Sequence, residues 1–280
     1  MFEMLRSRIP IGGLTIVSQY LFVLPTSKFE TYSQINLFSK KVLCKMKRDV
    51  ILITGAAGNL GRAVSSKLAA SGFRLALVDR TVASLDSLLA GLPKDGEYIT
   101  LPNINLSDAA DVAEMVTQVV KRFGAISGLV NTVGGFRTGA VIEEAADQWS
   151  LMMTLNAYVT LTTSAAVLPF MRNEGYGRIV HISAGSALKA GANQAAYAAS
   201  KSAVIRIIES IAEEHRMDGI TANCILPSTI DTPQNRADMP NAPTDSWVKP
   251  SAIAELIEFL VSEQSRAVTG SAIHATGIGC

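Results

Sequence analysis

Tyr197 and Lys201 have the residue types and the spacing that proton transfer requires. They lie four residues apart in a segment with helical apolar periodicity, so a helix places both side chains on one face. The pKa of a phenol is near ~10, which makes it a poor proton donor or acceptor at neutral pH, and a neighbouring ammonium group lowers that pKa. The pair could therefore carry a proton to or from a substrate oxygen while a hydride moves. Alone it is weak evidence, because Tyr and Lys at this spacing are common on protein surfaces.

A glycine-rich turn follows the first apolar segment of the domain. Residues 50–53 form a short, β-branched apolar run, which is typical of a strand buried on both faces of a parallel sheet. Gly55, Gly58 and Gly61 recur at every third position, and residues 60–71 have the pattern of a helix. A strand, a glycine turn and a helix N-terminus direct backbone N–H groups at a phosphate, and glycine allows close approach. We therefore expect dinucleotide binding here; the simpler alternative is an ordinary glycine turn.

An acidic residue ends the next predicted strand. Asp79 follows residues 74–78 and lies 18 residues after Gly61. In dinucleotide-binding units, an acidic residue at about this separation binds the ribose hydroxyls of the adenosine half. A carboxylate there would repel the extra phosphate of NADP, so NAD is the preferred cofactor. Arg80 beside it could accommodate that phosphate and keeps NADP possible.

The elements that must position these residues alternate between strand and helix from residue 46 onward. Five prolines between Pro227 and Pro250 exclude a long helix there and mark a candidate substrate loop or lid. The alternation predicts an α/β fold, with a doubly wound parallel sheet and helices on both faces. Strands are expected at residues 50–53, 74–78, 97–101, 126–130, 178–182, 220–225 and 271–274, and helices at 60–71, 81–90, 108–123, 143–172, 196–217 and 250–262.

The composition narrows the class of protein. A chain of 280 residues is long enough for one large domain with a substantial core. A net charge of +1 argues against nucleic acid as the main partner. The partner expected of a hydride-transferring enzyme is instead a small-molecule substrate. Cys44, Cys224 and Cys280 have no metal-ligand spacing and suggest no disulfide framework, so we expect no metal site and a reducing, cytoplasmic location.

Residues 1–45 are expected to form an N-terminal extension outside the fold, which leaves residues 46–280 as the domain. Residues 9–25 are mostly apolar, but they are short for a membrane span of ~20 residues and contain polar interruptions. Three interpretations stay open: a weak anchor or targeting segment, a disordered extension, or an upstream start site ahead of Met46. A membrane is therefore not an expected partner.

Together these motifs resemble the short-chain dehydrogenase/reductase family over residues 48–277. The resemblance implies a single Rossmann-like domain with a seven-stranded sheet, NAD(P)-dependent hydride transfer, and a homodimer or homotetramer. In that family the long helices, here at residues 143–172 and 196–217, form an interface between subunits. The matching segments are Thr54–Gly61, Asp79, Asn131–Gly134, Asn156, Gly177–Val180, Tyr197 with Lys201, and Pro227–Thr232.

The resemblance also implies roles for individual residues. Tyr197 would be the catalytic acid/base, Lys201 would hold the nicotinamide ribose and lower the pKa of the tyrosine, and Asn156 would anchor a water that extends the proton relay. Ile230 and Thr232 would meet the nicotinamide carboxamide. The implied cofactor-binding set is Gly55, Gly58, Asn59, Leu60, Gly61, Asp79, Arg80, Asn105, Leu106, Asn131, Val133, Tyr197, Lys201, Pro227, Ile230 and Thr232.

Three departures from the family pattern concern cofactor contacts. Asn59 stands where the turn usually has its second glycine, but Asn tolerates a positive φ, so the turn can survive. Asn105 replaces an Asp that touches the adenine amine, and its side-chain carbonyl can still accept that hydrogen bond. Ser228 follows Pro227 where glycine is usual, so the backbone beside the nicotinamide is expected to run differently.

The fourth departure concerns catalysis. The family's catalytic Ser lies 13 residues before the tyrosine, and here that position is Ala184. Ser183 should point to the other side of a strand, and Ser186 could reach the site only from an unusual loop. The segment is similar to the dihydropteridine reductase branch, which works on quinonoid rings without that Ser. The substrate stays open between a ketone or secondary alcohol, a 3-oxoacyl thioester, and a quinonoid or pterin-like ring. The alternative function is a nucleotide-binding sensor or assembly subunit with little catalysis.

Overall fold

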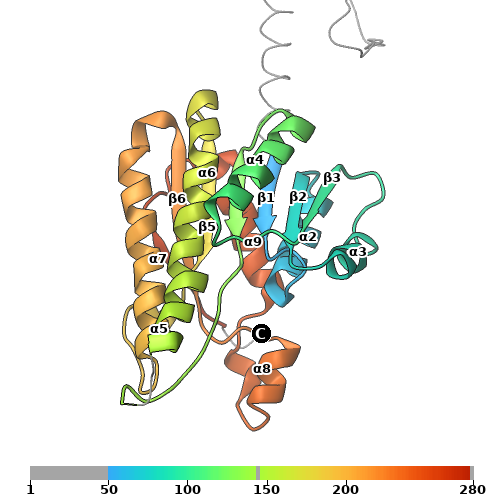
Figure 1. Ribbon diagram of the computed structural model, residues 1–280. Helices are drawn as coiled ribbons and strands as arrows, with labels where there is room; N and C mark the ends of the chain where they lie inside the picture. Colours follow the sequence, from blue (N-terminus) through green and yellow to red (C-terminus); the bar gives the residue numbers. More distant parts are fainter. Residues whose placement is uncertain (1–49, 143–145, 278–280) are drawn as a thin grey trace, which may run out of the picture. The chain divides into compact units, whose positions relative to one another are not determined.

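The computed structural model describes residues 50–142 and 146–277, and these form a seven-stranded parallel sheet with helices on both faces (Figure 1). The strand order is β3-β2-β1-β4-β5-β6-β7, so the chain runs outward from β1 to β3 and then crosses back to β4. In such a sheet the ligand crevice lies at the carboxyl ends of the strands where the direction reverses, here between β1 and β4. The strands are β1 (Val50–Thr54), β2 (Arg74–Asp79), β3 (Tyr98–Pro102), β4 (Gly128–Asn131), β5 (Gly177–Ile182), β6 (Ile220–Pro227) and β7 (Ala272–Ala275).

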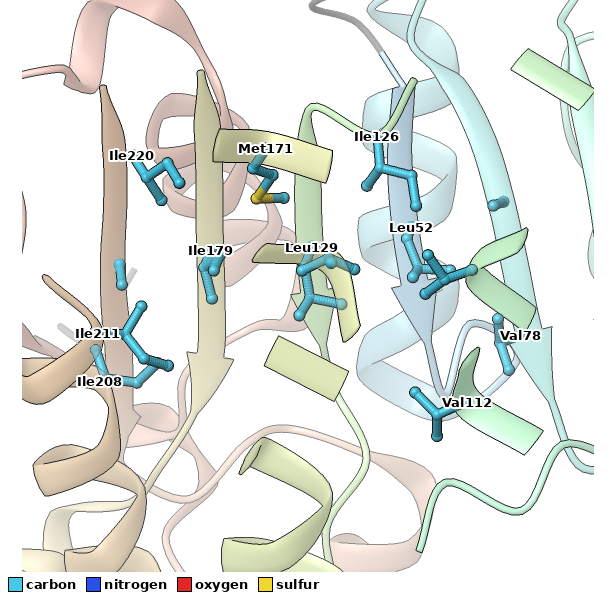
Figure 2. Packing of buried hydrophobic residues seen from close by; sticks show 14 of the residues in the cluster. Leu52, Val78, Val112, Ile126, Leu129, Met171, Ile179, Ile208, Ile211 and Ile220 are labelled. Atoms are coloured by element: carbon cyan, nitrogen blue, oxygen red, sulfur yellow. The ribbon is translucent and has the colours of Figure 1, made fainter. Parts of the chain in front are cut away.

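The two apolar layers arise from the two-residue period of the strands. Leu52 of β1 belongs to one buried cluster, whereas its neighbours Ile51 and Ile53 belong to the other. Figure 2 shows the first layer, in which Leu52, Leu129 and Ile179 lie in register on neighbouring strands. Helices α4 (Ala109–Phe123), α6 (Val159–Glu174) and α7 (Ala195–Glu214) cover this layer, and α2 (Asn59–Ala70), α3 (Val82–Leu89) and α9 (Pro250–Val261) cover the other.

The predicted doubly wound fold is confirmed, with all seven strands in place. One predicted helix, at residues 143–172, is wrong as a single α-helix. The described part begins with α5 (Ala146–Met152), continues through a π-helical segment, η1 (Met153–Tyr158), and ends in α6. Such π-helical turns inside α-helices occur often at functional sites.

The proline-rich segment at residues 227–250 forms a closed loop at the carboxyl end of β6. It holds only short helices, including α8 (Pro233–Asp238), as the prolines predict. Ile230 and Val248 form a parallel bridge, and the Asp231 N–H donates to the Val248 carbonyl oxygen over 2.8 Å. Trp247 is 8% exposed, so its side chain holds the base of the loop in the domain.

Residues 1–45 lie outside the described residues, so the extension and the domain boundary near residue 46 stay predictions. Within the described part of the chain, the stretch Gln148–Glu174 is long and apolar enough to cross a membrane. Half of its most apolar window is buried inside the domain, which is the pattern of a core helix.

Candidate active site

The glycine turn joins β1 to α2 through close main-chain contacts. Gly55 has a φ of 71°, and a Cβ there would lie 2.8 Å from Thr132 Oγ1. A Cβ on Gly61 would collide with the Gly55 carbonyl oxygen, so α2 can approach the turn only with glycine at this position. Gly58 is the N-cap of α2 and provides no side-chain cap, and an uncapped helix N-terminus is a ready site for an anion.

Asn59 does not use the positive φ expected from the sequence. It is the first residue of α2, and the non-glycine residues with positive φ in the described ranges are Asn103 and Asn193. The turn instead has its left-handed residue at Gly55. Leu60, next along α2, is 8% exposed and packs in the core beneath the turn.

Asp79 lies at the carboxyl end of β2 and is held against the glycine turn. Its Oδ2 accepts from the Ala57 N–H over 2.8 Å, and its Oδ1 accepts from the Arg80 N–H over 2.7 Å. The Ser84 hydroxyl donates to Oδ1 over 3.4 Å. The structure thus brings Asp79 and the turn together as predicted, with the Arg80 residue exposed beside them.

Asn105 is already engaged in a local turn. Its Oδ1 accepts from the Ser107 N–H at 3.1 Å and from the Ser107 hydroxyl at 2.7 Å. An adenine amine would therefore have to compete with Ser107 for this oxygen. The carbonyl oxygen of Leu106 accepts from Thr162 Oγ1 over 2.7 Å, which ties this loop to α6.

Asn156 lies in η1 and braces two other segments of the site. Its Oδ1 accepts from the Gly135 N–H at 2.9 Å, and its Nδ2 donates to the Gly135 carbonyl oxygen at 3.0 Å and to Ser200 Oγ at 2.9 Å. The residue is 1% exposed, so these contacts satisfy a buried amide. The loop after β4 and helix α7 are thereby joined through one side chain.

Lys201 is buried beside the end of β5. Its Nζ donates to the Ile182 carbonyl oxygen over 2.9 Å, and its own carbonyl oxygen accepts from Ser183 Oγ over 2.8 Å. Burial lowers the pKa of Lys201 to about 8, and its interaction with Cys224 opposes that shift. The ammonium group is therefore still mostly charged at neutral pH, but closer to titration than a surface lysine.

Tyr197 lies in the first turn of α7, on the same helix as Lys201. Burial raises the pKa of Tyr197 to about 12, which is opposite to the lowering expected from Lys201. The phenol therefore carries its proton at neutral pH. The rings of Phe136 and Tyr197 pack edge to face, with 4.7 Å between ring centroids and 88° between ring planes.

The serines around Ala184 do not present a hydroxyl to a substrate. Ser183 is 3% exposed and donates to Lys201 as described above. Ser186 Oγ is buried and has no hydrogen-bond partner among the described residues. An oxygen that solvent cannot reach is also closed to a substrate oxygen in this conformation, so Ala184 leaves the position without a replacement.

The end of β6 contributes the last predicted residues. Pro227 is its final, buried residue, and the next N–H, of Ser228, donates to the Ala275 carbonyl oxygen over 3.0 Å. Thr232 is 7% exposed, and its Oγ1 accepts from the Asn235 N–H over 3.1 Å as the N-cap of α8. Its hydroxyl hydrogen can still be donated to a ligand.

Sequence reasoning missed three residues of this site. Ser200 bonds Asn156, Phe136 packs on Tyr197, and His181 bonds Asn131 through Nδ1 over 3.0 Å. For His181 the sequence did hold a signal, because a histidine is unusual in the otherwise apolar end of a buried strand.

Known proteins resemble this chain over most of its length. A family model described as short chain dehydrogenase matches residues 49–242. The 3-oxoacyl-(acyl-carrier-protein) reductase FabG of Thermotoga maritima is 30% identical over 245 residues, which cover 83% of this chain and 98% of that protein. The 7alpha-hydroxysteroid dehydrogenase of Bacteroides fragilis is 29% identical over 245 residues, with 83% of this chain and 95% of that protein covered. The solved structure of levodione reductase matches with a TM-score of 0.77 at 28% identity, over 82% of this chain and 97% of that chain.

Proposed function

The chain belongs to the short-chain dehydrogenase family and is an NAD(P)-dependent oxidoreductase acting on small molecules, and from this premise we propose that Tyr197, Lys201 and Asn156 are its catalytic group. The observation that carries the proposal is their juxtaposition. Tyr197 and Lys201 share one face of α7. Ser200 lies between them in the sequence, and its hydroxyl accepts a hydrogen bond from the Asn156 amide. Asn156 bonds Gly135 in the loop after β4, and Lys201 bonds Ile182 at the end of β5, so both lie beside the crevice of the sheet.

The residues of the crevice fit a nicotinamide dinucleotide. A Cβ at Gly58 would meet only the Gly55 carbonyl oxygen, at 3.2 Å, so the turn is open at the N-terminus of α2. We assign the pyrophosphate to this turn, the adenosine ribose to Asp79, and the nicotinamide half to Lys201, Ile230 and Thr232. When bound, the cofactor supplies or takes the hydride.

Tyr197 is suited to donate a proton during reduction. Its raised pKa keeps the phenol protonated at neutral pH, so the proton is present when the substrate oxygen becomes negative. The charged Lys201 stabilises the phenolate left after that transfer, because the two groups share a helical face. Asn156 holds Gly135, next to Phe136, and so positions the ring that packs on Tyr197.

Asp79 supports a preference for NAD. Its carboxylate is oriented by the Ala57 and Arg80 N–H groups. Oδ1 also accepts from the Ser84 hydroxyl, whereas Oδ2 accepts from one described donor and keeps a lone pair for a ribose hydroxyl. The extra phosphate of NADP would lie against this negative charge. Family membership shows that a nicotinamide cofactor is bound, and from Asp79 we propose that NADH binds more tightly than NADPH.

The absence of a hydroxyl at Ala184 bears on the substrate class. A simple ketone develops charge on one oxygen, and in other enzymes loss of one donor to such an oxygen costs roughly 10²–10³ in kcat. We propose a small carbonyl, alcohol or quinonoid substrate, and Ala184 favours an acceptor whose charge is delocalised. The change Ala184→Ser should raise kcat/KM on simple ketones by about tenfold or more, with less gain on quinonoid rings; equal gains on both would contradict this preference.

The test of the proposed function is titration with NADH and with NADPH, followed by turnover on a panel of ketones, 3-oxoacyl thioesters and quinonoid rings. Tighter binding of NADH together with turnover of any panel member is expected. Tight binding without turnover on the whole panel would favour the second candidate, a nucleotide-binding sensor or assembly subunit. Ala184 is the observation behind that candidate, and the intact catalytic group counts against it.

A homo-oligomer, a dimer or a tetramer, is part of the proposal. Leu151, Tyr158 and Leu161 are 41%, 46% and 47% exposed along α5, η1 and α6, which is a face suited to contact with a second copy. Light scattering at micromolar concentration should therefore show more than a monomer. The free, buried thiol of Cys224 suits the cytoplasmic location that we propose.

A further inference from the structure

A row of polar side chains crosses the centre of the sheet beneath the crevice. Thr54 of β1 pairs in register with Asn131 of β4, which pairs with His181 of β5. Paired residues on neighbouring parallel strands point to the same face, so the three side chains form a line. They are 0%, 2% and 0% exposed, and Ser164 of α6 ends the line, also at 0%.

The hydrogen bonds of this row fix the orientation of the Asn131 amide. Its Oδ1 accepts from Thr54 Oγ1 at 2.6 Å and from the Val133 N–H at 3.1 Å, so that atom must be the carbonyl oxygen. Its Nδ2 is therefore the atom that faces His181 Nδ1 at 3.0 Å. Because an amide nitrogen only donates, Nδ1 must be an unprotonated acceptor. His181 then carries its proton on Nε2 and donates it to Ser164 Oγ, 2.9 Å away.

We propose that His181 is a positioning residue for cofactor binding, which it supports by accepting the Asn131 amide proton and so holding the Asn131 carbonyl oxygen against the Val133 N–H. This inference rests on the proposed function and assigns a role to a residue of this same site. Val133 lies in the loop after β4 that also carries Gly134, Gly135 and Phe136, so the line of bonds ends at the cofactor crevice and at the ring beside the catalytic tyrosine.

Two further observations support this role. The residue after His181, Ile182, accepts the bond from Lys201 Nζ, so one strand end holds both the lysine and the asparagine. Burial and the Lys201 charge lower the pKa of His181 to about 3, so the ring is neutral and adds no second positive charge beside the lysine. A neutral ring with a fixed tautomer is the form that can accept from Asn131.

The test compares three substitutions whose polar atoms differ in position. The Asn side chain places an oxygen near the position of Nδ1, whereas Gln reaches only toward the position of Nε2, and Leu provides neither. His181→Leu and His181→Gln should raise the Kd for NADH about tenfold, because the buried Asn131 amide N–H is left without an acceptor. His181→Asn should keep the Kd within about twofold of wild type, because it can still accept from Asn131. Val180→Ala, on the same strand but in the opposite layer, is the control for destabilisation without loss of the polar row.

The outcomes separate the inference from the proposed function. If His181→Leu binds NADH as tightly as wild type, or if His181→Asn is as weak as His181→Leu, the positioning role is wrong. If the wild-type chain binds neither NADH nor NADPH, the proposed function fails. Where variants fail to fold, nitrogen NMR of the wild-type histidines decides: a neutral ring protonated on Nε2 is expected for His181, and a proton on Nδ1 would overturn the inference.

Discussion

The two ends of the crevice are held in different ways. At the adenosine end, glycines shape the turn, and several of the assigned residues are exposed or half-buried; these are Gly55, Gly58, Asn59, Asp79 and Asn105. At the catalytic end, the supporting residues are at most 5% exposed and bond the main chain or one another through side chains; these are Asn131, Asn156, His181, Ser183 and Lys201.

This difference predicts how each end responds to substitution. An exposed turn can lose a side chain because water replaces its hydrogen bonds, whereas a buried network leaves unpaired groups when one member is removed. Binding of the adenosine half should therefore tolerate change, as Asn59 in the glycine turn illustrates. The catalytic end should instead lose both activity and stability when one of its buried side chains is removed.

Tyr197→Phe should abolish turnover, with a loss of at least about 10³-fold, because the only proton donor assigned at the catalytic end disappears. NADH affinity should stay within a few-fold of wild type, since the hydroxyl adds little to cofactor binding. Steady-state kinetics on the best panel substrate, with NADH fluorescence titration, measures both. Turnover at the wild-type rate would remove Tyr197 from the mechanism.

Asn156→Ala should lower kcat about a hundredfold and lower the free energy of unfolding by about 2 kcal/mol. It removes the side-chain partner of the half-buried Gly135 N–H and carbonyl groups and one of the two partners of the buried Ser200 hydroxyl. Thr163→Val is the control, because it removes a buried hydroxyl of neighbouring α6 that donates to the carbonyl oxygens of Val159 and Thr160 within its own helix. Denaturant unfolding and kinetics that show equal effects for the two variants would contradict the bracing role.

Asp79→Ala should weaken NADH binding about tenfold and leave NADPH binding unchanged or tighter, because a carboxylate that favours free ribose hydroxyls is lost. Fluorescence titration with both cofactors measures the ratio of the two Kd values. Asp86→Ala, which removes an exposed acid from α3, is the matched control. A ratio that does not change would place the preference elsewhere.

The rate of reduction should fall several-fold as the pH rises through about 8, the pKa of Lys201, because that residue loses its charge there. Tyr197 does not cause this fall, since its pKa is about 12. Loss of the folded state when Lys201 deprotonates does not cause the fall in rate either. Burial lowers its pKa below the unfolded value, so deprotonation of Lys201 favours the folded state as the pH rises. A profile of kcat/KM that stays flat to pH 9.5, with constant melting temperature, would contradict this assignment.

Asn59→Gly should have the smallest effect, with a change in stability within about 0.5 kcal/mol and unchanged NADH affinity. The residue is exposed and its backbone conformation is helical, so it neither needs glycine nor gains from it. A melting curve and one NADH titration are sufficient. A large gain in affinity would show that the side chain obstructs the pyrophosphate.

Local patterns in the sequence determined much of this protein. The apolar run before Gly55 predicted β1, the spacing of Tyr197 and Lys201 predicted a shared helical face, and Asp79 was expected at the end of β2 beside the turn. These inferences were possible because each depends on residues that lie close together in the sequence. Over such short separations the backbone geometry follows from the residue types.

Only the tertiary structure decided how the catalytic end is held. Asn156 bonds Ser200 from 44 residues away, His181 bonds Asn131 across 50, and Ser183 bonds the Lys201 main chain across 18. The raised pKa of Tyr197 likewise depends on burial, which its neighbours in the sequence do not specify. Residue types along the chain identify the groups that can react, whereas the partners, tautomers and protonation of those groups follow from packing between distant segments.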